Sequence, residues 1–250
     1  GIDLKKYVAE ILGRRDGTCR GRGGEMHLAD KEVGVMGASG IVGGILSTSL
    51  GLAFASQYRG DDRVTVTFFG EGSTNQGTFH ECLNLASIWK LPITFVCENN
   101  GWAEFTPQKN TMLIEEISSR AAAYGMPGIT VDGDDVLAVY EAAAKAIGQA
   151  RRGEGPTLLE CRTHRWLGHY VGDPQKYRTP EDIEAVRQFD PLPRFQNKLL
   201  QEGVLTEKIV PEIEGKINQE IEEAIEFGKN SPMPDPKELT EFVYAEEGGH

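Results

Sequence analysis

A carboxylate and a side-chain amide follow two apolar runs of the chain, in a pattern that could hold a divalent metal ion. Glu71 follows the β-branched and aromatic run 64–69, and Asn100 follows a second apolar run at 93–97. The segment between them carries apolar side chains at helical spacing and is expected to form a helix that ends before Leu91. Strands joined by a helix through short connections are usually parallel, so their carboxyl ends meet at one edge of the sheet. We therefore expect Glu71 and Asn100 to face one small volume.

The residues around Glu71 indicate what that volume would bind. Gly70 and Gly72 are expected to let the backbone turn sharply on either side of Glu71, and the Ser-Thr-Asn sequence at 73–75 offers caps for the next helix. Helix amino ends attract phosphate, and carboxylate, amide and carbonyl oxygens suit Mg²⁺. The stretch thus predicts a site for a metal ion that also holds a diphosphate. On spacing alone, an ordinary strand–helix–strand unit with a glycine turn explains it equally well.

A second group of functional residue types follows the apolar run 157–161. The loop 162–178 gathers arginines and histidines in a chain whose formal net charge is −12. Loops at the carboxyl ends of parallel strands commonly bind ligands. Arg165 can make paired contacts with phosphate oxygens, and His169 can donate a hydrogen bond or, near neutral pH, a proton. The alternative is that both are surface residues of a flexible loop.

Two glycine-rich segments precede these runs. The loop 19–30 places two arginines and His27 among glycines. The arginines could bind phosphate, although a solvated surface loop is at least as consistent with this composition. The segment 36–44 is expected to open a long helix, and its small residues permit the close approach of a ligand or of another helix.

Strand and helix patterns alternate from residue 64 to residue 162, which predicts an α/β fold with a doubly wound, mostly parallel sheet. We expect an α/β domain over residues 1–190 and a C-terminal helical extension over 191–250, which packs on the same domain or on a partner. The acidic run 132–135 is expected to be a turn and helix cap rather than a Ca²⁺ loop, because no downstream ligands follow it at EF-hand spacing. The other expected elements are helices at 3–14, 114–124, 135–152, 193–202 and 206–228, a strand at 128–131, and a helix that starts at 179–182.

Composition narrows the class of protein. The chain has 250 residues and is 39% hydrophobic, which is enough for one sizeable domain with a core. Its negative charge argues against nucleic acid and anionic membranes as partners. None of the four cysteines belongs to a Cys-x-x-Cys pair, and no stretch approaches the roughly 20 apolar residues of a membrane span. We expect a cytoplasmic protein with reduced cysteines, no nucleic-acid partner and no membrane attachment.

Together these motifs resemble the thiamin diphosphate motif, in which an acidic residue between two glycines is closed by a pair of asparagines. Over nearly its whole length the chain is similar to α subunits of the thiamin diphosphate-dependent first component of 2-oxo acid and acetoin dehydrogenase complexes. The acetoin branch is the most similar, through the segments 75–81, 88–92 and 98–101.

The resemblance implies a set of site residues. It makes the side chains of Glu71 and Asn100 and the main-chain carbonyl of Trp102 ligands of Mg²⁺. Glu71 is a departure from the pattern, since most relatives carry Asp there and the branched-chain members carry Glu; the longer side chain bears on metal geometry and preference. His169 and His27 are implied to be catalytic. The residues implied to bind thiamin diphosphate are Gly40, Val42, Gly70, Glu71, Gly72, Ser73, Asn100, Trp102, Arg165 and His169.

Three further positions in the loop 162–178 follow from the resemblance. Asp173 is implied to order the loop. His164 matches no functional position and is expected to be structural. Tyr170 stands where animal pyruvate relatives have a phosphorylatable serine, so that form of control should be absent.

The resemblance also implies an activity and partners. The chain would be the α subunit of a dehydrogenase that uses thiamin diphosphate and Mg²⁺, acts on acetoin or a 2-oxo acid, and transfers the acyl group to a lipoyl-bearing acyltransferase. It would be active only with a β subunit, in a heterotetramer. Two alternatives are a transketolase-type subunit that transfers a ketol unit and a non-catalytic cofactor-binding or scaffold subunit. The family's additional amino-terminal segment is absent from the sequence, so a truncated, cleaved or split subunit is expected.

Overall fold

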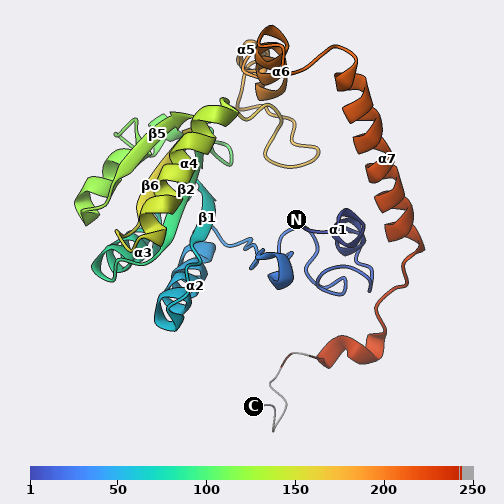
Figure 1. The fold of residues 1–250 in the computed structure, drawn as a ribbon, viewed down its shortest axis with the longest axis horizontal. Helices are drawn as coiled ribbons and strands as arrows, with labels where there is room; N and C mark the ends of the chain where they lie inside the picture. The colour runs from blue at the N-terminus through green and yellow to red at the C-terminus, as the bar shows by residue number, and fades with distance from the viewer. Residues whose placement is uncertain (242, 244–250) are drawn as a thin grey trace. The chain divides into compact units, whose positions relative to one another are not determined.

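The computed structural model describes residues 1–241 and residue 243 (Figure 1). The chain divides into two compact units. The sheet unit comprises Ile41–Val204, and the terminal unit comprises Gly1–Gly40 together with the segment that begins at Leu205.

The terminal unit joins distant parts of the chain. Helix α1 (Leu4–Ile11) packs against helix α7 (Ile209–Asn230). A side-chain Cβ at Gly228 would lie 2.9 Å from Cδ1 of Leu12 and 3.4 Å from the Ala9 amide nitrogen, so the two elements approach closely there and a larger residue would require the Leu12 side chain to move. Because the start of the chain joins a helix near its end, the expected boundary at residue 190 does not coincide with a boundary between the units.

The sheet unit is built on four parallel strands. They are β1 (Thr65–Gly70), β2 (Ile93–Asn99), β5 (Gly128–Asp132) and β6 (Thr157–Arg162). Their order across the sheet is β1-β2-β6-β5, and every neighbouring pair is parallel. The β-branched and aromatic runs read from the sequence are these strands, and the prediction of an α/β fold with a parallel sheet is confirmed.

Helices cover both faces of the sheet. They are α2 (Gly44–Arg59), α3 (Gly77–Ile88) and α4 (Val136–Arg151). Leu46 of α2 and Phe79 of α3 belong to one buried cluster with Phe95. Val139 of α4 packs in a second cluster with Leu159. Since neighbouring residues of a strand point to opposite faces, the two clusters form two core layers, one on each side of the sheet.

Several helix ends follow the sequence signals. The Asp135 side chain accepts hydrogen bonds from the amides of Leu137 and Ala138 and caps α4, which confirms the predicted turn and cap at 132–135. Thr179 and Asp182 form a reciprocal capping box at the start of α5.

The start of α3 differs from the expectation. The prediction that residues 73–75 cap this helix is wrong, because they belong to a 3₁₀ turn, η2 (Glu71–Asn75), and Gln76 precedes the helix without a side-chain cap. The Thr74 hydroxyl instead donates to the carbonyl of Glu71 at 2.7 Å. A hydroxyl can bond a backbone group of its own turn as readily as a helix end, and sequence alone does not separate the two.

The segment 114–124 also differs, since only Ile117–Tyr124 is helical, as the 3₁₀ helix η4. The other elements, in chain order, are η1 (Lys31–Val33), β3 (Trp102–Ala103) and β4 (Thr106–Pro107), which pair as a small antiparallel hairpin, η3 (Gln108–Asn110), α5 (Pro180–Arg187), α6 (Pro191–Gln201) and η5 (Pro236–Thr240).

All four cysteines are free thiols, and burial raises the pKa of Cys161 to about 11. In the described part of the chain no helix is both long and apolar enough to cross a lipid bilayer.

The glycine-rich loop near the start of the chain folds around a carboxylate. Glu10 is completely buried, and its two oxygens accept hydrogen bonds from four backbone amides of the loop. The donors are Cys19, Gly21, Gly23 and Gly24, at 2.7 to 3.2 Å. Arg20 and Arg22 form ion pairs with Glu241 and Glu238. The loop amides that could have received a phosphate are therefore occupied by Glu10.

We predict that Glu10→Ala destabilises the chain by about 2–4 kcal/mol, because it leaves four partly buried amides without their acceptor. Glu10→Gln, which keeps one acceptor oxygen, should cost about half as much. Urea unfolding of the three proteins measures both values. Equal stability of all three would mean that the carboxylate does not organise the loop.

Candidate functional site

Glu71 is a buried carboxylate at the carboxyl edge of the sheet. It directly follows β1, it is 1% exposed, and neither carboxylate oxygen has a hydrogen-bond partner in the described part of the chain. Burial raises the pKa of the Glu71 carboxyl, and the amides of Glu71 and Asn100 and the charge of Arg165 offset part of this effect. An unpartnered buried carboxylate is costly, so the group is best explained as one that meets a cation.

Asn100 lies beside this carboxylate, since its backbone amide acts on the Glu71 pKa. Gly70 pairs with Glu98 in the parallel register, which brings the residues after both strands to one edge. The Asn100 Oδ1 atom accepts a hydrogen bond from the Trp102 amide at 3.1 Å and retains a second lone pair. Strand β3, which begins at Trp102, packs against the η2 turn. The structure thus gathers Glu71, Asn100 and Trp102, and their role as metal ligands stays a prediction.

Glu160 provides an internal comparison. It is also completely buried in the same sheet, but both of its oxygens are hydrogen-bonded. One accepts from the Asn99 side-chain amide at 2.7 Å, and the other accepts from the Ser118 amide at 2.8 Å and the Thr130 hydroxyl at 3.2 Å. The fold therefore satisfies one buried carboxylate with its own donors and leaves Glu71 without any.

Arg165 faces the same volume with the opposite charge. Its guanidinium lies 5.9 Å from the centre of the Trp102 ring and 5.7 Å from that of Tyr177, and its Nη2 donates to the Tyr177 hydroxyl at 2.9 Å. Its Nε is buried without a partner, and within the described residues Arg165 forms no ion pair within 4 Å of a carboxylate. The charge of Arg165 lowers the Glu71 pKa without forming an ion pair with it, so the two opposite charges leave room for a cation beside Glu71 and an anion beside Arg165.

Asp173 organises the loop that carries Arg165. Its carboxylate accepts hydrogen bonds from the Tyr177 hydroxyl at 2.6 Å, the His169 amide at 2.8 Å and the Gln175 amide at 2.9 Å. Burial would raise the pKa of Asp173, but these hydrogen bonds outweigh it and hold the pKa below its usual value. This geometry supports the predicted ordering role of Asp173.

His169 is exposed at the tip of this loop. Its ring lies edge-on to Phe105, with 6.0 Å between the ring centres, so the loop rests on the hairpin of β3 and β4. His164, predicted to be structural, is held by the Asp134 carboxylate and stacks on Phe189 at 4.2 Å. The side chain of Tyr170 is exposed.

The backbone changes direction at the glycines beside Glu71, because strand β1 ends at Gly70 and the 3₁₀ turn η2 begins at Glu71. Neither Gly70 nor Gly72 has a positive φ, and Gly70 is extended, with φ −80° and ψ 162°, so this change of direction does not use the left-handed conformation that glycine favours. A Cβ at Gly72 would lie 2.7 Å from the Ala103 Cβ, so Gly72 is required for the close approach of η2 to β3. Ser73, predicted to offer its amide to a diphosphate, is buried in the same turn.

The remaining predicted residues fall in both units. Val42, exposed in the sheet unit, precedes Gly43, whose added Cβ would lie 3.4 Å from Gln76 just after the η2 turn. Gly40 and His27 belong to the terminal unit and lie side by side, since an added Cβ on Gly40 would be 3.9 Å from His27 Cε1.

Sequence reasoning missed two residues that hold Arg165. They are Tyr177, which bonds both Arg165 and Asp173, and Arg178, which is buried and donates to the Arg165 carbonyl at 2.8 Å. In the sequence, these two residues are indicated only by the pairing of an aromatic residue with an arginine at the end of the positively charged loop 162–178.

The donor set at this edge fits a hard divalent cation. Within residues 1–241 and 243, no three His, Cys, Asp or Glu side chains gather closely enough to hold a metal ion. A metal here would depend on the unpartnered Glu71 carboxylate together with amide and carbonyl oxygens, which are ligands that Mg²⁺ accepts. The Arg165 guanidinium, whose Nε has no hydrogen-bond partner among the described residues, fits an anion carried by that metal.

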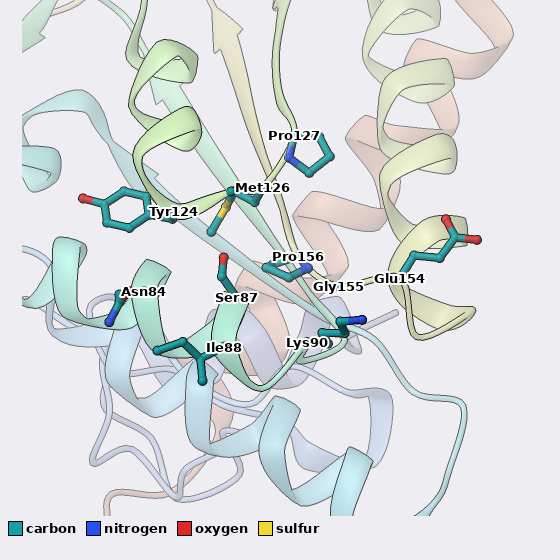
Figure 2. A pocket seen from close by; sticks show the side chains of 11 residues that line it. Asn84, Ser87, Ile88, Lys90, Tyr124, Met126, Pro127, Glu154, Gly155 and Pro156 are labelled. Atoms are coloured by element: carbon teal, nitrogen blue, oxygen red, sulfur yellow. The ribbon is translucent and has the colours of Figure 1, made fainter.

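A pocket of about 260 Å³ lies at the opposite edge of the sheet (Figure 2). Lys90, Pro127 and Pro156 line it, and each precedes the amino end of a strand. Figure 2 shows that side chains from α3 also border it, Ser87 and Ile88 among them. Since ligands of parallel α/β sheets bind at the carboxyl ends of strands, we assign the candidate site to the edge with Glu71.

The chain was compared with protein families and with curated proteins. The model of the family described as "Dehydrogenase E1 component" matches residues 1–237. The α subunit of acetoin:2,6-dichlorophenolindophenol oxidoreductase from Bacillus subtilis is 47% identical over 252 residues, which cover 100% of this chain and 75% of that protein. The protein of the same name from Cupriavidus necator is 43% identical, over 98% of this chain and 74% of its own length.

A pyruvate dehydrogenase relative is also similar. The chloroplastic E1 component subunit alpha-3 from Oryza sativa is 40% identical over 100% of this chain and 61% of its own length. The chain belongs to the dehydrogenase E1 component family, as an α subunit of the type found in acetoin and pyruvate dehydrogenases. The family resemblance read from the sequence is confirmed.

The raised pKa of Glu71 predicts a pH dependence. The folded chain holds the carboxyl proton more tightly than the unfolded chain, so the contribution of Glu71 to the free energy of unfolding is fully present below the ordinary carboxyl pKa of roughly 4.3 and is lost as the pH rises through the raised value. Glu71→Gln, which is neutral at every pH, should lose this dependence and be the more stable form at pH 7.

Urea unfolding across this pH range, with EDTA present, measures the effect. Glu98→Gln, at an exposed carboxylate on β2, is the matched control and should follow the wild type. If the free energies of unfolding of Glu71→Gln and the wild type change in parallel with pH, burial does not raise the pKa of the Glu71 carboxyl.

Proposed function

We propose that the chain is the α subunit of a thiamin diphosphate-dependent dehydrogenase that acts on acetoin or a 2-oxo acid and passes the acyl group to a lipoyl-bearing acyltransferase. The observation that carries this proposal is the buried Glu71 carboxylate, neither oxygen of which has a hydrogen-bond partner among the described residues. Arg165, whose charge acts on the Glu71 pKa, forms no ion pair within 4 Å of a carboxylate in the described part of the chain. A Mg²⁺–diphosphate group would satisfy both charges at once.

The residues at the carboxyl edge have distinct roles in this proposal. Glu71, the Asn100 side chain and the Trp102 carbonyl would hold Mg²⁺, and Arg165 would bind the diphosphate. The cofactor would also contact His169 and the backbones of five residues, namely Gly40, Val42, Gly70, Gly72 and Ser73. When bound, thiamin diphosphate would supply the nucleophile for the substrate carbonyl, and these residues would hold and orient it.

Two histidines would serve the substrate. His169 is held by its own amide on Asp173 and by the ring of Phe105, which leaves its imidazole exposed to donate a hydrogen bond or a proton to a carbonyl oxygen. His27, exposed in the terminal unit, is proposed for the same kind of contact.

Acetoin is the proposed substrate. The two relatives with the higher identities, 47% and 43%, are named for acetoin, and the pyruvate relative is 40% identical. All three are named as α subunits, so we propose a heterotetramer with a β subunit, in which the cofactor lies at an interface.

A substrate assay tests the proposal. The chain co-expressed with its β subunit should reduce 2,6-dichlorophenolindophenol when given acetoin, thiamin diphosphate and Mg²⁺, and should act more slowly on pyruvate, branched-chain 2-oxo acids and ketose sugars. The chain alone should show no turnover. Glu71→Ala in the same pair should lose activity and metal-dependent cofactor binding. Full turnover by the chain alone, or ketol transfer between sugars, would refute the assignment.

A conservative change at Arg165 tests the diphosphate contact. Arg165→Lys keeps the charge but loses the paired geometry and the stacking on Trp102 and Tyr177, so the Kd for thiamin diphosphate should rise about tenfold. Calorimetry on the assembled pair measures the Kd. Arg187→Lys, at an exposed ion pair on α5, is the control and should leave it unchanged. Equal affinities for both variants would remove Arg165 from the site.

A further inference from the structure

The pocket of about 260 Å³ at the amino edge of the sheet has the features of a separate binding site. Every residue that lines it belongs to the sheet unit. Its volume is below the roughly 300–1,000 Å³ that drug-sized ligands occupy, so it suits a small molecule. The pocket lies at the opposite edge of the sheet from Glu71, so a ligand there would bind independently of the proposed cofactor.

A hydroxyl group at this pocket is buried without a partner. The Ser87 Oγ atom is shielded from solvent and has no hydrogen-bond partner among the described residues. A serine inside a helix usually points to solvent or donates to the carbonyl one turn earlier, and Ser87 does neither. Figure 2 shows its hydroxyl pointing toward the Met126 side chain, which also lines the pocket. A ligand oxygen would satisfy this buried donor.

Lys90, another lining residue, has a backbone conformation that lysine rarely adopts. Its φ is 49°, and it directly follows Trp89, the C-cap of α3. Glycine is favoured for left-handed residues at helix ends, and those that end α2 and η4 are Gly60 and Gly125. A lysine is less stable than a glycine in this conformation, which indicates that its side chain has a role of its own.

The Lys90 ammonium gives the pocket a positive charge. Within the described residues it forms no ion pair within 4 Å of a carboxylate. The pocket is lined by one carboxylate, that of Glu154, and Arg152 already pairs with it at 2.7 Å. The aliphatic stem of Lys90 lies beside Gly155, whose added Cβ would be 3.9 Å from Lys90 Cβ. A cation and a hydroxyl donor that both lack partners favour an anionic ligand.

Apolar side chains select the rest of the ligand. Those that line the pocket are Ile88, Met126, Pro127 and Pro156. We propose that the pocket binds the anion of a small carboxylic acid with a short hydrocarbon chain. Its carboxylate accepts hydrogen bonds from Lys90 and Ser87, which are about one turn apart at the end of α3, and its chain lies on the apolar wall. An inorganic anion would leave that wall without contacts.

Binding of 3-methylbutanoate to the 250-residue chain tests this proposal. An NMR titration that observes the ligand at pH 7 should give saturable binding with a Kd on the order of 1 mM, which is typical of so small a ligand. 3-Methylbutanamide has the same shape without the charge and should bind about tenfold more weakly or worse. Inorganic phosphate should not compete.

Substitutions locate the ligand. Lys90→Met should raise the Kd for 3-methylbutanoate about tenfold or more, and Ser87→Ala should raise it about fivefold. Lys145→Met, at an exposed lysine of α4, is the matched control and should leave the Kd unchanged. Lys90→Gly should also lose binding, but its urea midpoint should rise above that of the wild type, because glycine adopts the left-handed conformation without strain. Loss of binding in a more stable variant cannot come from unfolding.

The contrary results are distinct from one another. The absence of saturable binding, or equal affinities for the acid and the amide, overturns the proposal. An unchanged Kd in Lys90→Met places the ligand elsewhere in the chain, and competition by inorganic phosphate means that the hydrocarbon chain is not recognised; either result overturns it too. If Lys90→Gly is no more stable than the wild type, the backbone of Lys90 gives no reason to assign a role to its side chain. None of these results alters the proposed function.

Discussion

The carboxyl edge of the sheet depends on one buried negative charge that the protein leaves unsatisfied. Folding a carboxylate into the interior without donors is unfavourable, and the same sheet shows that the chain is able to provide donors, because Glu160 has three. At Glu71 the turn η2, the hairpin of β3 and β4 and the loop with Arg165 surround the carboxylate without contacting its oxygens within hydrogen-bond distance. In the proposed function, a cation bound at Glu71 would recover this unfavourable free energy as part of its binding free energy.

The elements around Glu71 are held by local contacts rather than by the sheet itself. Asn99 bonds Glu160 with its side-chain amide and accepts from the Gly101 amide, while Asn100 accepts from the Trp102 amide. The two neighbouring asparagines thus fix the chain as it leaves β2. On the other side, Asp173 and Tyr177 fix Arg165 before any ligand is bound. A preorganised pair of this kind loses little entropy when it binds a ligand.

Much of this arrangement follows from the sequence. Alternating strand and helix patterns give parallel strands, and parallel strands bring Glu71 and Asn100 to one edge, which the register of β1 and β2 confirms. The details that depend on contacts between loops did not follow. Position 72 must be glycine because Ala103, far along the chain, packs against it. The predicted cap of α3 was wrong because the Thr74 hydroxyl donates to a carbonyl of its own turn instead.

The glycine-rich loop 19–30 shows a further limit. From the sequence, the two arginines of this loop could bind phosphate, and a solvated surface loop was at least as consistent with its composition. In the structure the amides of the loop bind a carboxylate, that of Glu10, from a helix that precedes it. The composition of a loop can indicate that its backbone binds an anion. It does not show whether that anion is a ligand or a side chain of the same protein. Family membership, in contrast, was accessible because it depends on several motifs at once rather than on any single contact.

The packing of α1 against α7 constrains how the chain can fold as it is made. Residues 41–204 contain their own core and sheet, so the contacts that hold this unit together are all made within it. Helix α1 emerges earlier but its packing surface on α7 is not synthesised until the sheet unit is complete. Short helices are marginal in water by themselves, so we expect α1 to become stable only after α7 has been synthesised. The order of folding at this end of the chain is then the reverse of the order of synthesis.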